Sequence, residues 1–192
     1  MSIKVPTPLT RQVQLLLPDW IDAAVDRNRV YASDEDKVAL AVELSRRNVE
    51  LATGGPFGAA VFDGHGRVVG VGVNRVVPQN CSVAHAEMMA FMCAQTAVSQ
   101  FRLNELGPMT LATSAQPCCM CYGASFWAGI NNLLIGARSE DVMRLTEFDE
   151  GPLPADWIGE LERRGIAVRR DILRAQARDV FTLYAEQGGL TY

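Results

Sequence analysis

The chain has 192 residues and a formal net charge of −4, with 18 Lys and Arg against 22 Asp and Glu. This length suits a single domain with a sizeable core, and a hydrophobic fraction of 48% excludes wholesale disorder. An acidic chain is not expected to be a dedicated nucleic-acid binder, because phosphate binding needs a basic surface. No stretch approaches the roughly 20 apolar residues of a membrane span, and the start of the chain has no signal-peptide pattern.

The five cysteines are distributed unevenly, and three of them fall at positions 118, 119 and 121. Secreted domains that are stapled by disulfides spread their cysteines so as to close loops. Clustered cysteines in a reducing compartment more often hold a metal. We therefore expect a cytoplasmic, metal-binding protein.

The first part of the chain predicts a lead-in, a long helix and a β-hairpin. Residues 1–33 read as one or two short helices. A capping box at Ser33 begins a helix that Gly54 and Gly55 end. Two β-rich runs flank an Asp-Gly turn, which is typical of a hairpin. These runs are 57–62 and 68–73.

The remainder of the chain alternates helices and strands. Helices are predicted at 85–98, at 118–128, at 157–163, in a short segment that Ser139 caps, and in a final segment that runs to about 187. Strands are predicted at 109–113, 133–137 and 166–169, and loops at 76–83 and 147–154. Strands separated by helices imply crossovers and a largely parallel sheet behind the initial antiparallel pair.

These elements predict an α/β fold: a three-layer α/β/α sandwich on a five-stranded mixed sheet. We expect one domain over residues 1–192, with a helical lead-in at 1–33 and a C-terminal helix and tail at 170–192.

Three residues have the spacing of metal ligands. Cys118 and Cys121 lie three residues apart, so they project from one face of a predicted helix. They fall in its first turn, where free N–H groups favour thiolates. His85 also starts a predicted helix, and helix starts that follow strands gather at one edge of an α/β sheet. One imidazole and two thiolates would hold Zn²⁺ and leave its fourth position open to water.

Glu87 is the candidate base for such a site. Zn²⁺ with two thiolates and a neutral imidazole has no net charge, so its acidity is weakened and a nearby base must help to deprotonate the water. Glu87 lies two residues beyond His85, and at the first turn of a helix both side chains can reach a pocket beyond the helix end. A carboxylate there can accept the proton of the water and deliver it to a substrate nitrogen.

A structural zinc site is the alternative for these residues, but it needs a fourth protein ligand. The other histidine of the chain, His65, falls in the predicted hairpin turn.

The pattern His-x-Glu followed by Pro-Cys-x-x-Cys is the signature of zinc-dependent nucleobase deaminases. His85-Ala86-Glu87 and residues 117–121 have this pattern, and through them the chain resembles the cytidine deaminase superfamily. The loop Phe148-Asp149-Glu150-Gly151-Pro152 and the terminal Tyr192 resemble its guanine deaminase branch. The resemblance runs from about Gly54 to the last residue.

The resemblance implies one Zn²⁺ per chain, held by His85, Cys118 and Cys121, with Glu87 as the catalytic base. Glu150 resembles the second carboxylate with which guanine deaminases shuttle protons, and Asp149 is the less favoured occupant of that role.

The resemblance also assigns substrate contacts. Asn74 should hydrogen-bond the polar edge of the base, Phe57 and Trp127 should border its ring, and Ala86 should offer backbone contacts. Tyr192 resembles the terminal tyrosine that closes the pocket, which in some relatives comes from the domain-swapped tail of a dimer partner. The alternatives for these residues are buried aromatics, a turn asparagine and a frayed chain end.

The sequence departs from the family pattern in three places. Cys119 stands where a proline or small apolar residue is common, and it is expected to point away from Cys118 on the helix. Glu147 stands where a glycine is expected, which affects the geometry of the loop that follows. Residues 1–33 form a longer lead-in than compact relatives have.

The resemblance implies hydrolytic deamination of a free purine base, with guanine converted to xanthine and ammonia. In this reaction Glu87 moves a proton from water to the ring nitrogen, and Glu150 makes the amino group a leaving ammonia. The expected partners are a small nucleobase substrate and a second copy of the chain in a homodimer, without a membrane or a nucleic acid.

Two alternatives remain open. The first is deamination of another aminated heterocycle: an aminotriazine, cytosine or cytidine, or an adenosine in tRNA. The second is a non-catalytic zinc-stabilised scaffold. A scaffold has no use for an unliganded Glu87 beside the metal, and the RNA reaction needs a basic groove.

Overall fold

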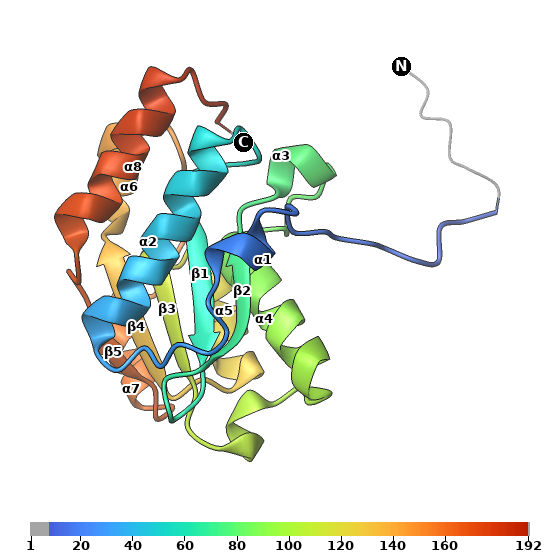
Figure 1. The fold of residues 1–192 in the computed structure, drawn as a ribbon. Helices are drawn as coiled ribbons and strands as arrows, with labels where there is room; N and C mark the ends of the chain where they lie inside the picture. Colours follow the sequence, from blue (N-terminus) through green and yellow to red (C-terminus); the bar gives the residue numbers. More distant parts are fainter. Residues whose placement is uncertain (1–7, 192) are drawn as a thin grey trace.

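A five-stranded mixed sheet forms the centre of the protein in a computed structural model that describes residues 8–191 (Figure 1). The strands are β1 (Gly58–Phe62), β2 (Val68–Val73), β3 (Thr110–Ala115), β4 (Asn132–Ala137) and β5 (Ala167–Arg169), in the spatial order β2-β1-β3-β4-β5. Strand β1 runs antiparallel to both β2 and β3, whereas β3, β4 and β5 are parallel. The prediction of a mixed five-stranded sheet is confirmed.

Helices cover both faces of the sheet, which confirms the three layers. One face is covered by α2 (Asp34–Glu50), α6 (Ser139–Leu145) and α8 (Arg174–Glu186). The other face is covered by α4 (Ala86–Val98), α5 (Cys119–Ala128) and α7 (Trp157–Glu162). Three short elements complete the described chain: α1 (Ile21–Ala24), α3 (Val76–Gln79) and the 3₁₀ turn η1 (Leu103–Leu106). Within residues 8–191, no helix has the length and apolar character needed to cross a bilayer.

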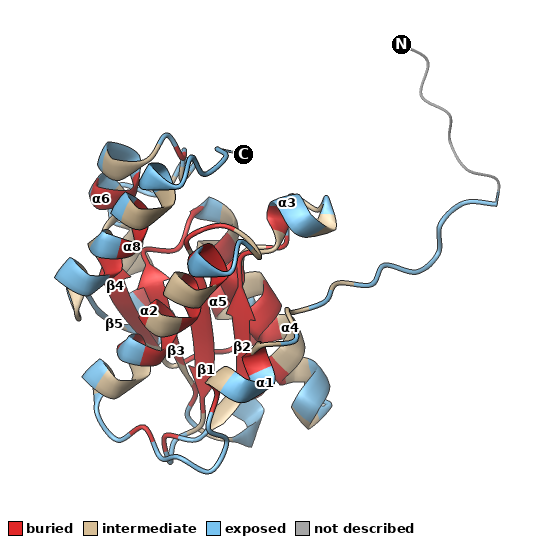
Figure 2. Ribbon diagram, turned by 45° about the horizontal axis from the view of Figure 1, so that its top comes forward, coloured by how far each residue is buried: buried red, intermediate tan, exposed pale blue. Residues whose placement is uncertain are grey.

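The strands supply two separate hydrophobic cores. In β1, Ala60 and Phe62 face the core under α2, whereas Ala59 and Val61 face the core under α4. All five residues of this strand are buried, as Figure 2 shows for the centre of the sheet. Burial on both faces is the reason why these strands read as continuous apolar runs rather than as an alternating pattern.

Three local predictions differ from the structure. A one-turn helix, α3, occupies part of the expected loop at 76–83, and the Cys81 N–H closes it on the Val76 carbonyl at 3.0 Å. Helix α2 ends at Glu50 rather than at Gly54-Gly55, because Ala52 already takes a left-handed φ of 51°.

The third difference concerns the start of α6. Arg138, not Ser139, is the N-cap residue, because its backbone N–H donates to the Asp141 carboxylate at 3.0 Å. This bond fixes the first turn of the helix.

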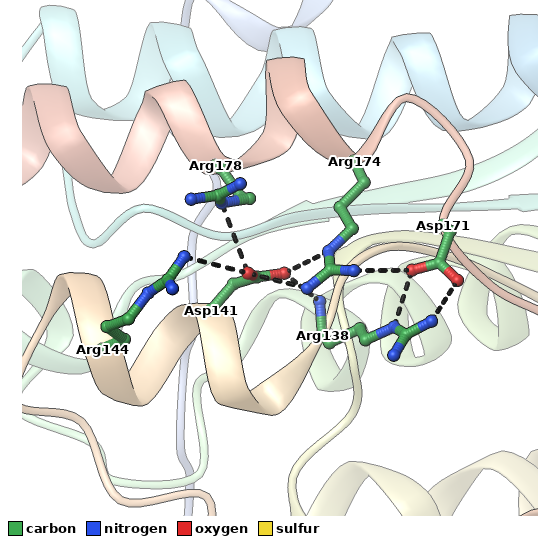
Figure 3. Close-up of polar contacts among 6 residues, drawn as sticks. All are labelled: Arg138, Asp141, Arg144, Asp171, Arg174 and Arg178. Atoms are coloured by element: carbon green, nitrogen blue, oxygen red, sulfur yellow. Dashed lines mark hydrogen bonds and ion pairs between the residues drawn. The ribbon is translucent and has the colours of Figure 1, made fainter.

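Asp141 is a buried carboxylate that ties α6 to α8 (Figure 3). Arg174 donates to its two oxygens at 2.6 and 2.9 Å, and Arg178 Nε lies 3.3 Å from one of them. Arg138 turns instead to Asp171, with two hydrogen bonds of 2.7 Å each. The hydrogen bonds from Arg174 hold the pKa of Asp141 below its usual range. These bonds therefore hold α8 against α6, the helix that precedes the loop at 146–156.

Replacing Asp141 by Asn should lower the free energy of unfolding by about 3 kcal/mol, because it removes the buried charge that pairs with Arg174 and Arg178. Asp171→Asn is the matched control, since that carboxylate is half-exposed and should cost less than about 1 kcal/mol. Urea denaturation at pH 7 measures both. Equal losses of unfolding free energy in the two variants would contradict the conclusion that Asp141 is the main ionic contact between α6 and α8.

The same pair predicts a pH dependence. The folded pKa of Asp141 is depressed, so its stabilisation is present above the ordinary value of 3.8 and is lost as pH falls below it. The difference in stability between wild type and Asp141→Asn should therefore shrink below about pH 4. A difference that stays constant between pH 7 and pH 3 would contradict this.

Candidate active site

Two helix N-termini meet at one edge of the sheet. His85 is the N-cap residue of α4 and Cys118 is the N-cap residue of α5, which begins shortly after β3 ends. The candidate ligand atoms of His85, Cys118 and Cys121 all lie within 4.8 Å of one another, and Cys118 Sγ is 3.5 Å from His85 Nδ1. The structure thus brings His85 next to two cysteines that lie more than 30 positions later in the sequence.

These three side chains fit a divalent cation. The neighbouring Cys121 thiol donates to Cys118 and lowers the pKa of Cys118 to about 4, while the pKa of Cys121 is raised beside that thiolate. Burial alone would lower the pKa of His85, but its contact with Cys118 raises it overall. Two thiols this close cannot both ionise without a positive charge between them. Zn²⁺ supplies that charge, accepts thiolate and imidazole ligands, and keeps a fourth position open in catalytic sites.

Glu87 lies beside the ligands without belonging to their group. It sits in the first turn of α4 and is 6% exposed. Thr113 Oγ1 donates to its Oε1 at 3.4 Å, and Cys121 Sγ lies 3.4 Å from its Oε2. Burial, followed by the negative charge of Cys118, raises the pKa of Glu87 to about 7. A carboxyl group with this pKa can both take up and release a proton near neutral pH.

Glu150 approaches the same cavity from the loop after α6. Its backbone carbonyl accepts a hydrogen bond from the Cys119 N–H at 3.0 Å, which fixes the loop on the N-terminus of α5. Burial, then the charges of Cys118 and Glu87, raises the pKa of Glu150 to about 8. Asp149 lines the cavity too, but its side chain is engaged by the Gly151 N–H at 2.9 Å. Glu150 is therefore the better placed of the two for proton transfer.

Asn74 presents a hydrogen-bond donor to the cavity that it lines. The residue is 1% exposed, and its Oδ1 accepts from the Val76 N–H at 3.2 Å. No described residue accepts from its Nδ2 group, so that group is available to a ligand. Ala86 is fully buried and lines the cavity beside it.

Aromatic rings form the apolar wall of the cavity. Phe57 and Phe148 both line it, with their rings edge to face at a centroid distance of 5.4 Å. Tyr184 of α8 stacks on Phe148 at 6.1 Å. A flat, ring-sized ligand could lie against this wall, with Asn74 at its polar edge.

Trp127 does not border this cavity, so that prediction is wrong for a single chain. It lies at the C-terminal end of α5 and is 73% exposed, next to Phe126 at a centroid distance of 5.3 Å. Cys118 lies nine positions earlier, and a helix rises about 1.5 Å per residue, which places Trp127 far from the metal ligands. Tyr192 lies outside the described residues.

Cys119 is exposed and does not join the group of metal ligands. Its sulfur faces Gly151, where a Cβ atom would lie 2.7 Å away. The expectation that it points away from Cys118 agrees with this placement. Its neighbour Gly151 has a φ of 67°, so a side chain there would be strained as well.

Two cavity residues received no role from the sequence. Gln116 is 6% exposed, lies directly before the Pro-Cys motif and lines the cavity. Phe148, which also lines it, is the first residue of the loop that resembles guanine deaminases. Their adjacency to assigned residues was the available signal, but only the structure shows which neighbours face the cavity.

Residues 32–137 match the family of the cytidine and deoxycytidylate deaminase zinc-binding region. The guanine deaminase of Bacillus subtilis is 35% identical over 101 residues, which cover 53% of this chain and 62% of that protein. A probable cytosine deaminase of Schizosaccharomyces pombe is matched over 65% of its length. The chain therefore spans somewhat less than two thirds of these curated relatives.

Solved structures match over nearly the whole chain. The guanine deaminase from Nitrosomonas europaea is 40% identical with a TM-score of 0.86, and the match covers 93% of this chain and 98% of that one. A mutant protein in complex with 8-azaguanine is 41% identical with a TM-score of 0.85, covering 92% and 98% respectively.

Replacing Cys121 by Ser should reduce the zinc content from about one per chain to a small fraction of that, because the buried position leaves two protein ligands for the metal. Cys119→Ser is the matched control, since this neighbouring thiol lies outside the ligand group and its loss should leave zinc bound. Elemental analysis of the purified proteins measures both. Full zinc occupancy in the Cys121 variant would contradict the assigned ligand set.

Proposed function

Because the chain belongs to the cytidine and deoxycytidylate deaminase family, we propose that it is a zinc-dependent hydrolytic deaminase that converts guanine to xanthine and ammonia. The main observation for this reaction is that the buried carboxylate of Glu87 lies next to the three candidate metal ligands but is not one of them. The similarity to the guanine deaminase of Nitrosomonas europaea over almost its full length supports guanine as the substrate.

Zinc held by His85, Cys118 and Cys121 would supply the Lewis acidity that makes a water molecule easier to deprotonate, as attack on the amino-bearing carbon of the base requires. Glu87 accepts a proton from that water and returns it to the neighbouring ring nitrogen. Its pKa of about 7 suits both steps, because the two protonation states are then of similar free energy at neutral pH.

Glu150 is the candidate for the second proton transfer, which turns the amino group into a leaving ammonia. Its pKa of about 8 makes it protonated at neutral pH, so it can donate. Asn74 Nδ2 would donate to an acceptor on the polar edge of the base, and Phe57 with Phe148 would hold the ring against the cavity wall.

We also propose that the protein works as a homodimer in the cytoplasm, in purine catabolism. An exposed apolar pair supports the dimer: Trp127 and Phe101 are more than 70% exposed and line one surface hollow. Exposed apolar patches typically mark interaction surfaces. The five cysteines are all free thiols, as expected in a reducing compartment.

Glu87→Gln should keep zinc and fold but lower kcat/KM for guanine by about 1,000-fold or more, because the amide cannot accept the proton of the water. Glu162→Gln is the control, since this carboxylate is exposed on α7. Ammonia release measures the activity, and turnover close to wild type in the Glu87 variant would refute the mechanism.

A panel of bases decides the substrate. Guanine should release ammonia with the highest kcat/KM among guanine, adenine, cytosine, their nucleosides and aminotriazines. A preference for cytosine or an aminotriazine would replace guanine while keeping the reaction class. Tight, salt-sensitive binding of tRNA would favour the RNA reaction, and no ammonia from any substrate would favour the scaffold.

The dimer is tested by light scattering, which should give the mass of two copies of the 21.0 kDa chain. Trp127→Asp should shift the protein toward the monomer, because a charge would then be buried in the contact. A monomeric wild type at micromolar concentration would refute the dimer.

A further inference from the structure

The lead-in before α2 touches the segment that contains Asn74. Leu16 donates its N–H to Gln79 Oε1 of α3 at 3.3 Å, and its carbonyl accepts from Arg75 Nε at 3.1 Å. Arg75 also donates to the backbone carbonyl of Thr53. In Figure 1 the lead-in passes beside α3 before it enters α1. A segment remote in sequence from the catalytic motifs is thus bound to the residue that directly follows Asn74.

A second connection runs from the lead-in to Asn74 through three side chains. Trp20 Nε1 donates to Thr53 Oγ1 at 3.0 Å, and Thr53 Oγ1 donates to Asn48 Oδ1 at 2.8 Å. Asn48 Nδ2 then donates to the backbone carbonyls of Gly55 at 2.8 Å and Asn74 at 3.0 Å. We refer to Trp20, Thr53 and Asn48 as the Asn48 network.

The chemistry of these groups fixes the direction of every bond. An indole nitrogen can only donate, so the Thr53 hydroxyl accepts from Trp20 and must give its own proton to Asn48. The Asn48 oxygen therefore faces Thr53, and its amino group faces the two carbonyls. Asn48 is fully buried, where leaving one of these bonds unmade would be costly.

This network holds the backbone of Asn74 from one side, while Phe57, the residue directly before β1, holds it from the other. The Asn74 N–H donates to the Phe57 carbonyl at 3.0 Å, and its own carbonyl is occupied by Asn48. Gly54 permits this close approach, because a Cβ atom there would overlap the Asn74 carbonyl oxygen. With its backbone and Oδ1 both bonded, Asn74 is held in place at the cavity that it lines, and among the described residues its Nδ2 group has no acceptor.

We propose that Trp20, Thr53 and Asn48 are positioning residues for substrate binding, and that the lead-in stabilises the orientation in which Asn74 donates to the base. None of the three lines the cavity, so each acts through Asn74 rather than on the substrate. This inference rests on the proposed function, because it makes Asn74 a contact of the base.

Thr53→Val removes the hydroxyl at the centre of the network while keeping the size of the side chain. It should raise KM for guanine about fivefold with little change in kcat, because ground-state positioning of the base is weakened. Thr53→Ser retains the hydroxyl and should restore the wild-type KM. Trp20→Phe should act in the same direction as Thr53→Val, and Trp157→Phe, at the far end of the sheet, is its control.

A double-mutant cycle separates positioning from general destabilisation. If Thr53 acts through Asn74, Thr53→Val should have no further effect on kcat/KM in an Asn74→Ala background. An equal loss in both backgrounds would overturn the proposal. So would a lowered melting temperature accompanied by an unchanged KM.

Hydrogen exchange tests the network without activity. The Val76 amide donates to Asn74 Oδ1, so its exchange should be about tenfold faster in Thr53→Val, while amides of β3 keep their protection. If wild type deaminates guanine but Thr53→Val has wild-type KM and unchanged Val76 exchange, the network has no positioning role and the proposed function stands. If wild type deaminates no base, the proposed function fails, and Val76 exchange alone decides whether the network orients Asn74.

Discussion

The site depends on a charge conflict between two thiols. Cys118 and Cys121 are buried next to each other and to His85, and without a cation only one of the two sulfurs can carry a negative charge. A divalent ion bound between them resolves this conflict and compensates the burial of the ligands. The fold makes the arrangement possible because two helices begin at the same edge of the sheet, and their free N–H groups favour negative charge there.

The same burial sets the properties of the two carboxylates. Glu87 and Glu150 both lose solvent and both face the negative charge of Cys118, so the pKa of each is raised into the neutral range. Within residues 8–191, neither has an arginine or lysine partner that would hold it ionised, in contrast to Asp141, whose pKa the neighbouring arginines lower. The described structure thus separates carboxylates that can exchange protons from one that serves as a fixed ion-pair anchor.

The sequence predicted the metal centre because its chemistry is local in the chain. The motifs around His85 and Cys118 each lie within one turn of a helix, and a helix start restricts where their side chains can point. The hairpin and the sheet followed from equally local patterns. Trp127 was misplaced because the resemblance assigned it to the pocket without regard to the nine positions along α5 that separate it from Cys118.

The Asn48 network and the ion pairs of Asp141 with Arg174 and Arg178 could not be found in the sequence. Thr53 and Asn48 are five residues apart, but their partners Trp20 and Asn74 lie 33 and 26 positions away from them, respectively. Polar residues at such positions normally read as solvated helix or loop residues. Only the packing of the lead-in against the loop after α2 shows that their hydrogen bonds are partly or fully buried and directed.

The loop with Glu150 is held at three points that involve different parts of the fold. The bonds between Asp141 and Arg174 fix α6, the helix that leads into the loop. The Cys119 N–H holds the Glu150 carbonyl, and Tyr184 stacks on Phe148. Through Tyr184, whose hydroxyl donates to the Leu190 carbonyl at 2.7 Å, the C-terminal tail is connected to the cavity wall. A displacement of the tail therefore changes the aromatic wall first and Glu150 only indirectly, because the backbone bond to α5 is independent of α8. Substrate binding should for this reason be more sensitive to the tail than proton transfer is.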